Sequence, residues 1–303
     1  MSRLEHYGIW RDEGVDVLVT GVADRRLLAN VTCHVCAQPL PARSLHPLPL
    51  GVASPASVFV CSPELALLQV AADMSRASGK WRLELLQLLT EFCGTFRIIG
   101  DETHYKCPPL TSAKALSSFV RSASGLYGSR NLEAVLPYVL DGAASPPEAS
   151  LGLALSLPLK YGGEGLGSPE LNRTLETNEA ARIILGRDTI TPDILYRSRH
   201  ARRGGLPIEY DSVQFHSSRE QAEYDELRRN AYAAMGMSCL LVKPRHLRSL
   251  TAFDAVAQTV RKNVGVRARP EPTGYLEKRR ELHATLFGNY GGENCQKSYG
   301  LYG

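Results

Sequence analysis

The chain has 303 residues, of which 44% are hydrophobic, and a formal net charge of +4. This composition is typical of a globular protein and argues against a disordered or fibrous chain. An odd number of cysteines, seven, argues against a disulfide framework. No apolar run approaches the roughly 18 residues of a membrane helix, and residues 1–10 hold no apolar signal core. We therefore expect a cytoplasmic protein that does not enter a membrane.

Residues 1–140 mix strand patterns with helix patterns. Short apolar stretches predict strands at 15–22 and 58–61. Ser62-Pro63 is a typical helix start, with the serine as N-cap and the proline at the first helical position. Further helical patterns follow at 81–92, 113–121 and 131–139. We expect a small α+β domain in which these helices cover an N-terminal sheet.

Residues 141–248 form the second predicted domain, which starts at the joint Asp141-Gly142. Ser145-Pro146 begins a helix that Pro158 ends. The glycine-rich stretch 161–167 has neither the lysine of a P-loop nor the G-x-G-x-x-G spacing, so it matches no nucleotide-binding fingerprint. The remaining patterns predict hairpin strands at 193–197 and 206–211, a helix at 219–235 and a strand at 238–242.

Positive charge gathers in two places. Residues 243–280 hold ten Lys and Arg against three acids, and 249–303 reads as a basic helical tail. A second group lies between the hairpin strands, at Arg197, Arg199, Arg202 and Arg203. Such clusters fit a surface that binds phosphate, most simply that of a nucleic acid. A solvated face that keeps the protein soluble is the alternative for both.

The acids of the predicted hairpin carry the chemistry. Glu209 and Asp211 stand two apart on one strand, so their side chains point to the same face. Asp193 begins the neighbouring strand and can lie across from them. Carboxylates so close together repel one another unless a cation neutralises them. We expect these three acids to bind Mg²⁺ or Mn²⁺, which prefer carboxylate oxygen and phosphate; exposed acids on an edge strand are the alternative.

Three other residues are candidates for the same site. His216 has a side chain suited to acid–base chemistry or phosphate contact, although it could equally cap the next helix. Arg229 is our candidate for phosphate contact, beside the simpler pairing of Asp225 with Arg229 at i, i+4. Glu148 completes a capping box with Ser145, and it is also a candidate fourth metal ligand.

Taken in order, these motifs resemble a known group of nucleases. Asp193, I-E-Y-D-S at 208–212, His216, D-E-L-R at 225–228 and S-P-P-E at 145–148 are similar to the PD-(D/E)XK nuclease superfamily. The branch they resemble includes very-short-patch repair endonucleases and the C-terminal domain of AbiEi-type abortive-infection proteins. The resemblance covers about residues 141–248. It implies an α/β fold of the restriction-endonuclease type, with a mixed sheet and flanking helices.

The same resemblance implies a Mg²⁺-dependent endodeoxyribonuclease in phage defence or repair. Asp193, Glu209 and Asp211 would then be catalytic, with His216 and Arg229 at the phosphate or leaving group. Two departures put the catalysis in question. Ser212 replaces the usual glycine, and Asp211 stands where the superfamily has a lysine. The alternative is a non-catalytic protein that binds nucleic acid or neutralises a toxin.

Overall fold

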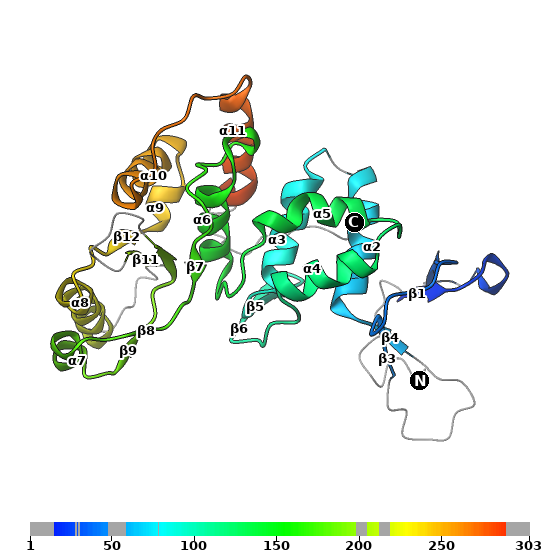
Figure 1. Ribbon diagram of the computed structural model, residues 1–303, viewed down its shortest axis with the longest axis horizontal. Coiled ribbons are helices and arrows are strands. Elements are labelled where there is room, and N and C mark those ends of the chain that lie inside the picture. The colour runs from blue at the N-terminus through cyan, green and yellow to red at the C-terminus, as the bar shows by residue number, and fades with distance from the viewer. Residues whose placement is uncertain are drawn as a thin grey trace.

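The computed structural model describes residues 15–27, 29, 31–47, 59–77, 79–197, 205–211 and 219–288. Helices and small sheets alternate along these residues, which makes the chain a mixed α/β protein (Figure 1). None of the helices in this described part is long and apolar enough to cross a membrane.

The N-terminal strands form separate pairs. Strand β1 (Val15–Val19) pairs in parallel with β2 (Val31–Val35), and β3 (Leu45–Pro47) pairs antiparallel with β4 (Phe59–Cys61). A short 3₁₀ turn, η1 (Val22–Asp24), follows β1. The predicted strand at 15–22 is thus present as far as Val19, and the one at 58–61 is described from Phe59 onward. In the described part of residues 1–140, two-stranded pairs replace the single sheet that we expected.

The predicted helices of the N-terminal region are present, as α2 (Pro63–Ala77), α3 (Trp81–Phe92), α4 (Ala113–Ser122) and α5 (Ser129–Val135). Ser62 caps α2, since its Oγ accepts a hydrogen bond from the amide of Leu65 at 3.2 Å. Helix α5 ends earlier than predicted because Pro137 cannot donate to the helical ladder, and the 3₁₀ turn η2 (Leu136–Tyr138) follows it. The hairpin of β5 (Phe96–Ile99) and β6 (Glu102–Tyr105) joins α3 to α4.

The C-terminal half contains a four-stranded mixed sheet in the order β12-β11-β10-β7. Its strands are β7 (Glu170–Leu171), β10 (Ile194–Tyr196), β11 (Leu206–Tyr210) and β12 (Leu240–Val242). The predicted hairpin is confirmed, because β10 and β11 are antiparallel with Ile194 opposite Ile208. The sequence did not predict β7, nor the excursion that follows it, with β8 (Leu175–Glu176), α7 (Glu179–Leu185) and β9 (Thr189–Ile190).

Helices surround this sheet. They are α6 (Pro146–Ser156), α8 (Arg219–Ala234), α9 (Pro244–Leu247), α10 (Leu250–Val264) and α11 (Tyr275–Phe287), with the 3₁₀ turn η3 (Leu159–Tyr161) after α6. In Figure 1 the sheet lies between α6 and α8. Helix α6 is apolar around most of its circumference, and its residues from Glu148 to Leu155 are all buried. It is therefore the central helix of the core.

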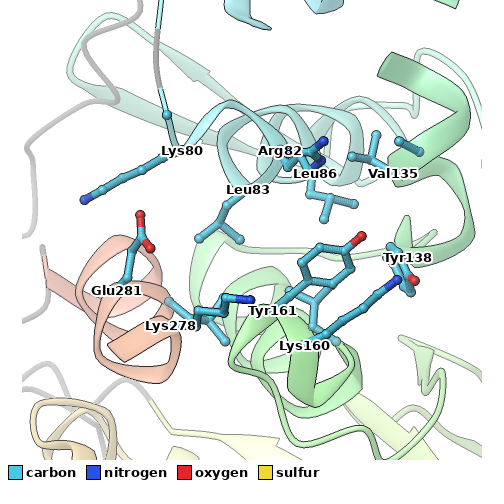
Figure 2. A pocket seen from close by; sticks show the side chains of 14 residues that line it. Lys80, Arg82, Leu83, Leu86, Val135, Tyr138, Lys160, Tyr161, Lys278 and Glu281 are labelled. Atoms are coloured by element: carbon cyan, nitrogen blue, oxygen red, sulfur yellow. The ribbon is translucent and has the colours of Figure 1, made fainter. Parts of the chain in front are cut away.

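One hydrophobic cluster runs through all three predicted regions. It contains Leu85 of α3, Leu151 of α6, Ile208 of β11, and Phe253 and Leu286 of α10 and α11. A smaller cluster joins α7 to α8. The division into 1–140, 141–248 and 249–303 stays a prediction, and the buried side chains on either side of each boundary belong to one cluster. Between α3, η3 and α11 this packing leaves a cavity of about 250 Å³ (Figure 2).

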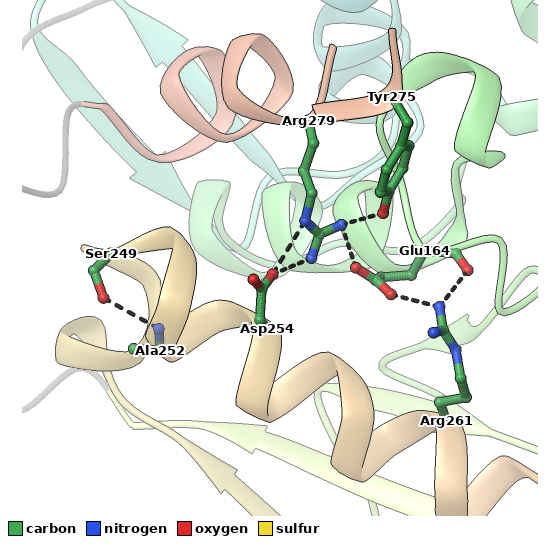
Figure 3. A network of polar contacts seen from close by, with 7 residues as sticks. All are labelled: Glu164, Ser249, Ala252, Asp254, Arg261, Tyr275 and Arg279. Carbon is green, nitrogen blue, oxygen red and sulfur yellow. Dashed lines mark hydrogen bonds and ion pairs between the residues drawn. The ribbon is translucent and has the colours of Figure 1, made fainter. Parts of the chain in front are cut away.

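A buried ionic network fixes the last two helices. Arg279 of α11 pairs with Glu164 and with Asp254 of α10, and it donates to the hydroxyl of Tyr275 at 2.7 Å (Figure 3). Arg261 of α10 reaches the same Glu164 at 2.6 Å. Glu164 and Arg279 are only 5% and 7% exposed, so removing either would leave a buried charge without its partner. The glycine-rich stretch thus anchors α10 and α11.

Candidate active site

The hairpin brings two of the predicted acids together. Asp193 directly precedes β10 and Glu209 lies on β11, each next to the paired residues Ile194 and Ile208. The Oδ2 atom of Asp193 accepts a hydrogen bond from the amide of Tyr210 at 2.6 Å, which fixes this carboxyl against β11. The two side chains therefore meet at the same end of the hairpin, as the sequence predicts.

Glu148 approaches the same place from the start of α6. Ser145 caps the helix, because its Oγ accepts from the Glu148 amide at 3.4 Å. The Glu148 carboxylate accepts from the Ser145 hydroxyl at 2.7 Å, the Ala144 amide at 3.1 Å and the Asn172 side chain at 2.7 Å. The capping role is thus present, with the amide of Ala144 in place of that of Ser145. Glu148 caps the helix and faces the hairpin at once.

The charges of these three residues interact. Burial, then the carboxylates of Glu148 and Glu209, raises the pKa of Asp193 to about 8. Burial also raises the pKa of Glu148; hydrogen bonds from Asn172 and Ser145 oppose this rise, and Glu209 adds to it. We call Glu148, Asp193 and Glu209 the carboxylate cluster. Titratable groups perturbed by burial and by one another are characteristic of functional sites.

Arg228 of α8 is the cation of this site. Its Nη2 atom contacts Oε1 of Glu209 and donates to the Thr191 carbonyl at 2.9 Å. Burial opposes the charge on Arg228, but the Glu209 carboxylate outweighs burial and raises the Arg228 pKa. The hydroxyl of Tyr232, one turn further along α8, donates to the same Glu209 oxygen at 2.7 Å. Glu209 is therefore held by two groups of α8.

Arg229, the predicted phosphate contact, lies elsewhere. It is exposed, and its Nε donates to the Asp225 carbonyl of its own helix at 3.4 Å. Consecutive residues of a helix point about 100° apart, so Arg228 and Arg229 cannot both face the hairpin. The structure brings Arg228 to the carboxylate cluster, and Arg229 stays a prediction.

Asp211 pairs with a lysine that the sequence did not single out. Its Oδ2 atom lies 3.2 Å from Nζ of Lys243, and both side chains are 32% exposed. Strand β11 ends at Tyr210, so strict alternation no longer governs the direction of the Asp211 side chain. The Asp211 amide still donates to the Val242 carbonyl at 2.9 Å, which keeps the residue beside β12.

The predicted basic loop is described only at its first residue. Arg197 binds Glu170 of β7 through two contacts, of 2.7 and 3.2 Å, and this pairing lowers the pKa of Glu170. The Arg197 guanidinium is thus engaged by an acid of the neighbouring strand. The predictions for Arg199, Arg202, Arg203 and His216 lie outside the described residues.

A metal ion at the carboxylate cluster would need several side chains as ligands. Across the described ranges, no group of three or more His, Cys, Asp and Glu side chains is arranged to hold one. Carboxylates are nevertheless the ligands that a hard cation prefers, so the cluster has suitable donor types without a metal-binding arrangement. Arg228 and Tyr232 both contact Oε1 of Glu209.

Sequence reasoning did not single out Asn172 or Lys243, and of the two adjacent arginines of α8 it chose Arg229 rather than Arg228. Asn172 has a positive φ of 48°, and its side chain bridges the Gly142 carbonyl and Glu148 at 3.0 and 2.7 Å. Asparagine tolerates this backbone conformation better than most residues, which is a weak turn signal. The spacing of Arg228 and Tyr232, i and i+4, indicates a shared helix face, but not which partner that face meets.

No protein-family model matches the chain, and no curated protein or solved structure gives a significant match. The resemblance to the PD-(D/E)XK nucleases therefore stays a prediction that depends on the residues quoted for it.

Proposed function

We propose that this chain is a metal-dependent phosphodiesterase that acts on nucleic acid, with its centre at the carboxylate cluster. One observation carries the proposal. Acids from α6, from the start of β10 and from β11 stand close enough that Glu148 and Glu209 help to raise the pKa of Asp193 to about 8. Such crowding disfavours the charged forms of the acids. A divalent cation bound between these carboxylates would neutralise their repulsion.

Asp193 and Glu209 would hold the cation, with Glu148 beside them and Asp211 tuning the site through Lys243. The cation, Mg²⁺ or Mn²⁺, would stabilise the charge that builds up on a phosphate and help an attacking water to ionise. Hydrogen-bond donors of the protein would orient the carboxylates around it. Ser145, Ala144 and Asn172 hold the Glu148 carboxylate in one orientation.

Arg228 has the clearest part in this proposal. In the structure it neutralises Glu209. If Glu209 turned to a cation, the Arg228 guanidinium would be released toward a phosphate, for which its planar array of donors is well suited. The positive charge of the sequence between residues 197 and 203 would favour the same nucleic acid. An endodeoxyribonuclease role in phage defence or repair follows from the resemblance alone.

A second candidate is a non-catalytic protein that binds nucleic acid or neutralises a toxin on the same fold. The contacts of the cluster favour it. Glu148 is held by three protein donors, and Glu209 is held by Arg228 and Tyr232. An internally satisfied set of acids of this kind can serve the fold without a metal.

Cleavage of supercoiled plasmid and of labelled single strands, with and without Mg²⁺ or Mn²⁺, separates the two candidates. The variants are Asp193→Asn and Glu209→Gln, which keep the shape of each side chain. Asp188→Asn is the matched control, because Asp188 is exposed and pairs with Arg182. We expect metal-dependent cutting that falls about 100-fold or more in the first two variants and is unchanged in the control. Absence of cutting, together with salt-sensitive binding in all four proteins, would favour the non-catalytic candidate.

A further inference from the structure

The cavity between α3, η3 and α11 lies far from the carboxylate cluster. Glu148 is in the first turn of α6, whereas Leu157, which lines the cavity, follows its last turn. At 1.5 Å per residue, the length of α6 alone separates them by about 14 Å. The lining comes from all three predicted regions, with Arg82 on α3, Lys160 on η3 and Lys278 on α11. A ligand held there would tie these regions together.

Positive charge dominates the lining. Lys80, Arg82, Lys160 and Lys278 stand against a single acid, Glu281. Figure 2 shows Arg82 on α3, Lys160 on η3 and Lys278 on α11, with Lys80 just before α3 and above Glu281. Among the described residues, Arg82, Lys160 and Lys278 form no ion pair with a carboxylate. Arg82, Lys160 and Lys278 around one hollow create a field that attracts an anion.

Lys160 is held in place by aromatic residues. Its Nζ lies 4.7 Å from the centre of the Tyr161 ring. Lys160 is positively charged at neutral pH, as lysine ordinarily is, and hydrogen bonding to Tyr161 raises its pKa further. The two tyrosine rings stand edge to face, with centres 5.5 Å apart. The ammonium group is thus oriented before any ligand arrives, which lowers the cost of binding.

The rest of the lining is apolar and includes Leu83, Leu86 and Leu282. In Figure 2 the Tyr161 ring lies below Leu86 of α3. A ring beside leucine side chains offers a flat apolar surface on which a heterocycle can stack. The cavity therefore combines cationic side chains that can bind a phosphate with an aromatic ring on which a planar base can stack.

We propose that this cavity binds a nucleoside phosphate through Arg82, Lys160 and Lys278, with its base against Tyr161. The volume of about 250 Å³ lies just below the range of about 300–1,000 Å³ that is typical of small-molecule sites, so a ligand there is no larger than a single nucleotide unit. The same chemistry could come from a free mononucleotide or from the 5′-phosphorylated end of a strand. Side chains make this site, and Tyr161 is the one residue of the glycine-rich stretch 161–167 in its lining.

Isothermal calorimetry on the full chain tests this site, in buffer without divalent metal so that the carboxylate cluster takes no part. The probes are AMP, GMP, CMP and UMP, then ribose 5-phosphate, and a 5′-phosphorylated trinucleotide. We expect mononucleotides to bind with a Kd below about 1 mM and about tenfold more tightly than ribose 5-phosphate. Lys160→Ala and Lys278→Ala should each weaken binding about tenfold. The matched control Lys262→Ala removes an exposed lysine of α10 and should change nothing.

Each outcome of this titration supports or overturns the proposed nucleotide site. Mononucleotide binding that both variants weaken and the control retains supports a site for free nucleotides. Binding of the trinucleotide alone, weakened by the same variants, supports the same chemistry with a strand end as its source. The proposal is overturned if no probe binds, if ribose 5-phosphate binds as well as AMP, or if Lys160→Ala and Lys278→Ala bind like wild type.

Discussion

Replacing Asp193 by asparagine should stabilise the folded chain at pH 8. The carboxyl of Asp193 has a pKa of about 8 in the folded chain, against an ordinary value of 3.8. Between these two pH values the folded chain holds a proton that the unfolded chain has released. Stability therefore falls as the pH rises from about 4 to about 8, and the loss is complete above the folded pKa. Asparagine carries no such charge and avoids the loss.

The size of the effect follows from the pKa difference of about 4 units. At about 1.4 kcal/mol per unit, ionising Asp193 in the folded chain costs at most about 6 kcal/mol. Glu148 shares this interaction and its own pKa is raised, so only part of the cost belongs to Asp193. Asparagine also keeps an oxygen for the Tyr210 amide. We expect a net gain of about 1–3 kcal/mol at pH 8.

Urea denaturation at pH 5 and pH 8 measures this gain, with Asp188→Asn as the control. Asp188 forms an exposed ion pair, so its replacement should change the free energy of unfolding by less than about 1 kcal/mol. The advantage of Asp193→Asn over wild type should be larger at pH 8 than at pH 5. An asparagine variant that is less stable than wild type at pH 8, or an advantage independent of pH, would refute the idea that the three carboxylates oppose one another.

Three further substitutions, two of them with a control variant, test the packing around the site and the core. Arg228→Ala should lower the free energy of unfolding by about 2–4 kcal/mol, because it leaves the half-buried carboxylate of Glu209 without its cation. The control Arg229→Ala removes an exposed side chain and should change this free energy by less than about 0.5 kcal/mol. Equal losses for the two variants in urea denaturation would contradict the site as described. Arg279→Ala should cost about 3–5 kcal/mol by breaking the buried network of Figure 3, and thermal unfolding close to that of wild type would show the network to be unimportant. Gly162→Ala should cost more than about 2 kcal/mol, because φ is +84° and the new Cβ would stand 2.4 Å from a main-chain oxygen of α11. Gly186→Ala, at φ +70° with open space around it, should cost only about 1 kcal/mol, and equal melting temperatures for the two glycine variants would exclude the close approach.

The sequence predicts the local parts of this fold well, for physical reasons. Ser62, Ser112 and Ser145 each begin a helix where the pattern predicts one, because a capping hydroxyl acts within a single turn. The hairpin was predictable from strand-like runs on either side of a polar break. Its register followed less securely, because a shift by one residue would have turned Glu209 to the other face.

The parts that the sequence did not predict depend on contacts between distant residues. Asn172 follows a strand of two residues, which is too short for any periodic pattern, yet it holds Glu148 from 24 positions away. The choice of Arg228 over Arg229 depends on how α8 is rotated against β11, which neighbouring residues do not encode. Lys243 meets Asp211 only because β12 pairs in parallel with β11. Tertiary packing decides each of these contacts.

Direct measurement of Mn²⁺ binding by calorimetry, at pH 6 and pH 8, is the clearest test of the proposed metal centre. The proposal predicts one Mn²⁺ ion per chain, bound more tightly at pH 8 because Asp193 must lose its proton first. Binding should be lost in Asp193→Asn and Glu209→Gln and retained in Asp188→Asn. Absence of binding at both pH values, or equal binding in all four proteins, would contradict a metal centre at the carboxylate cluster.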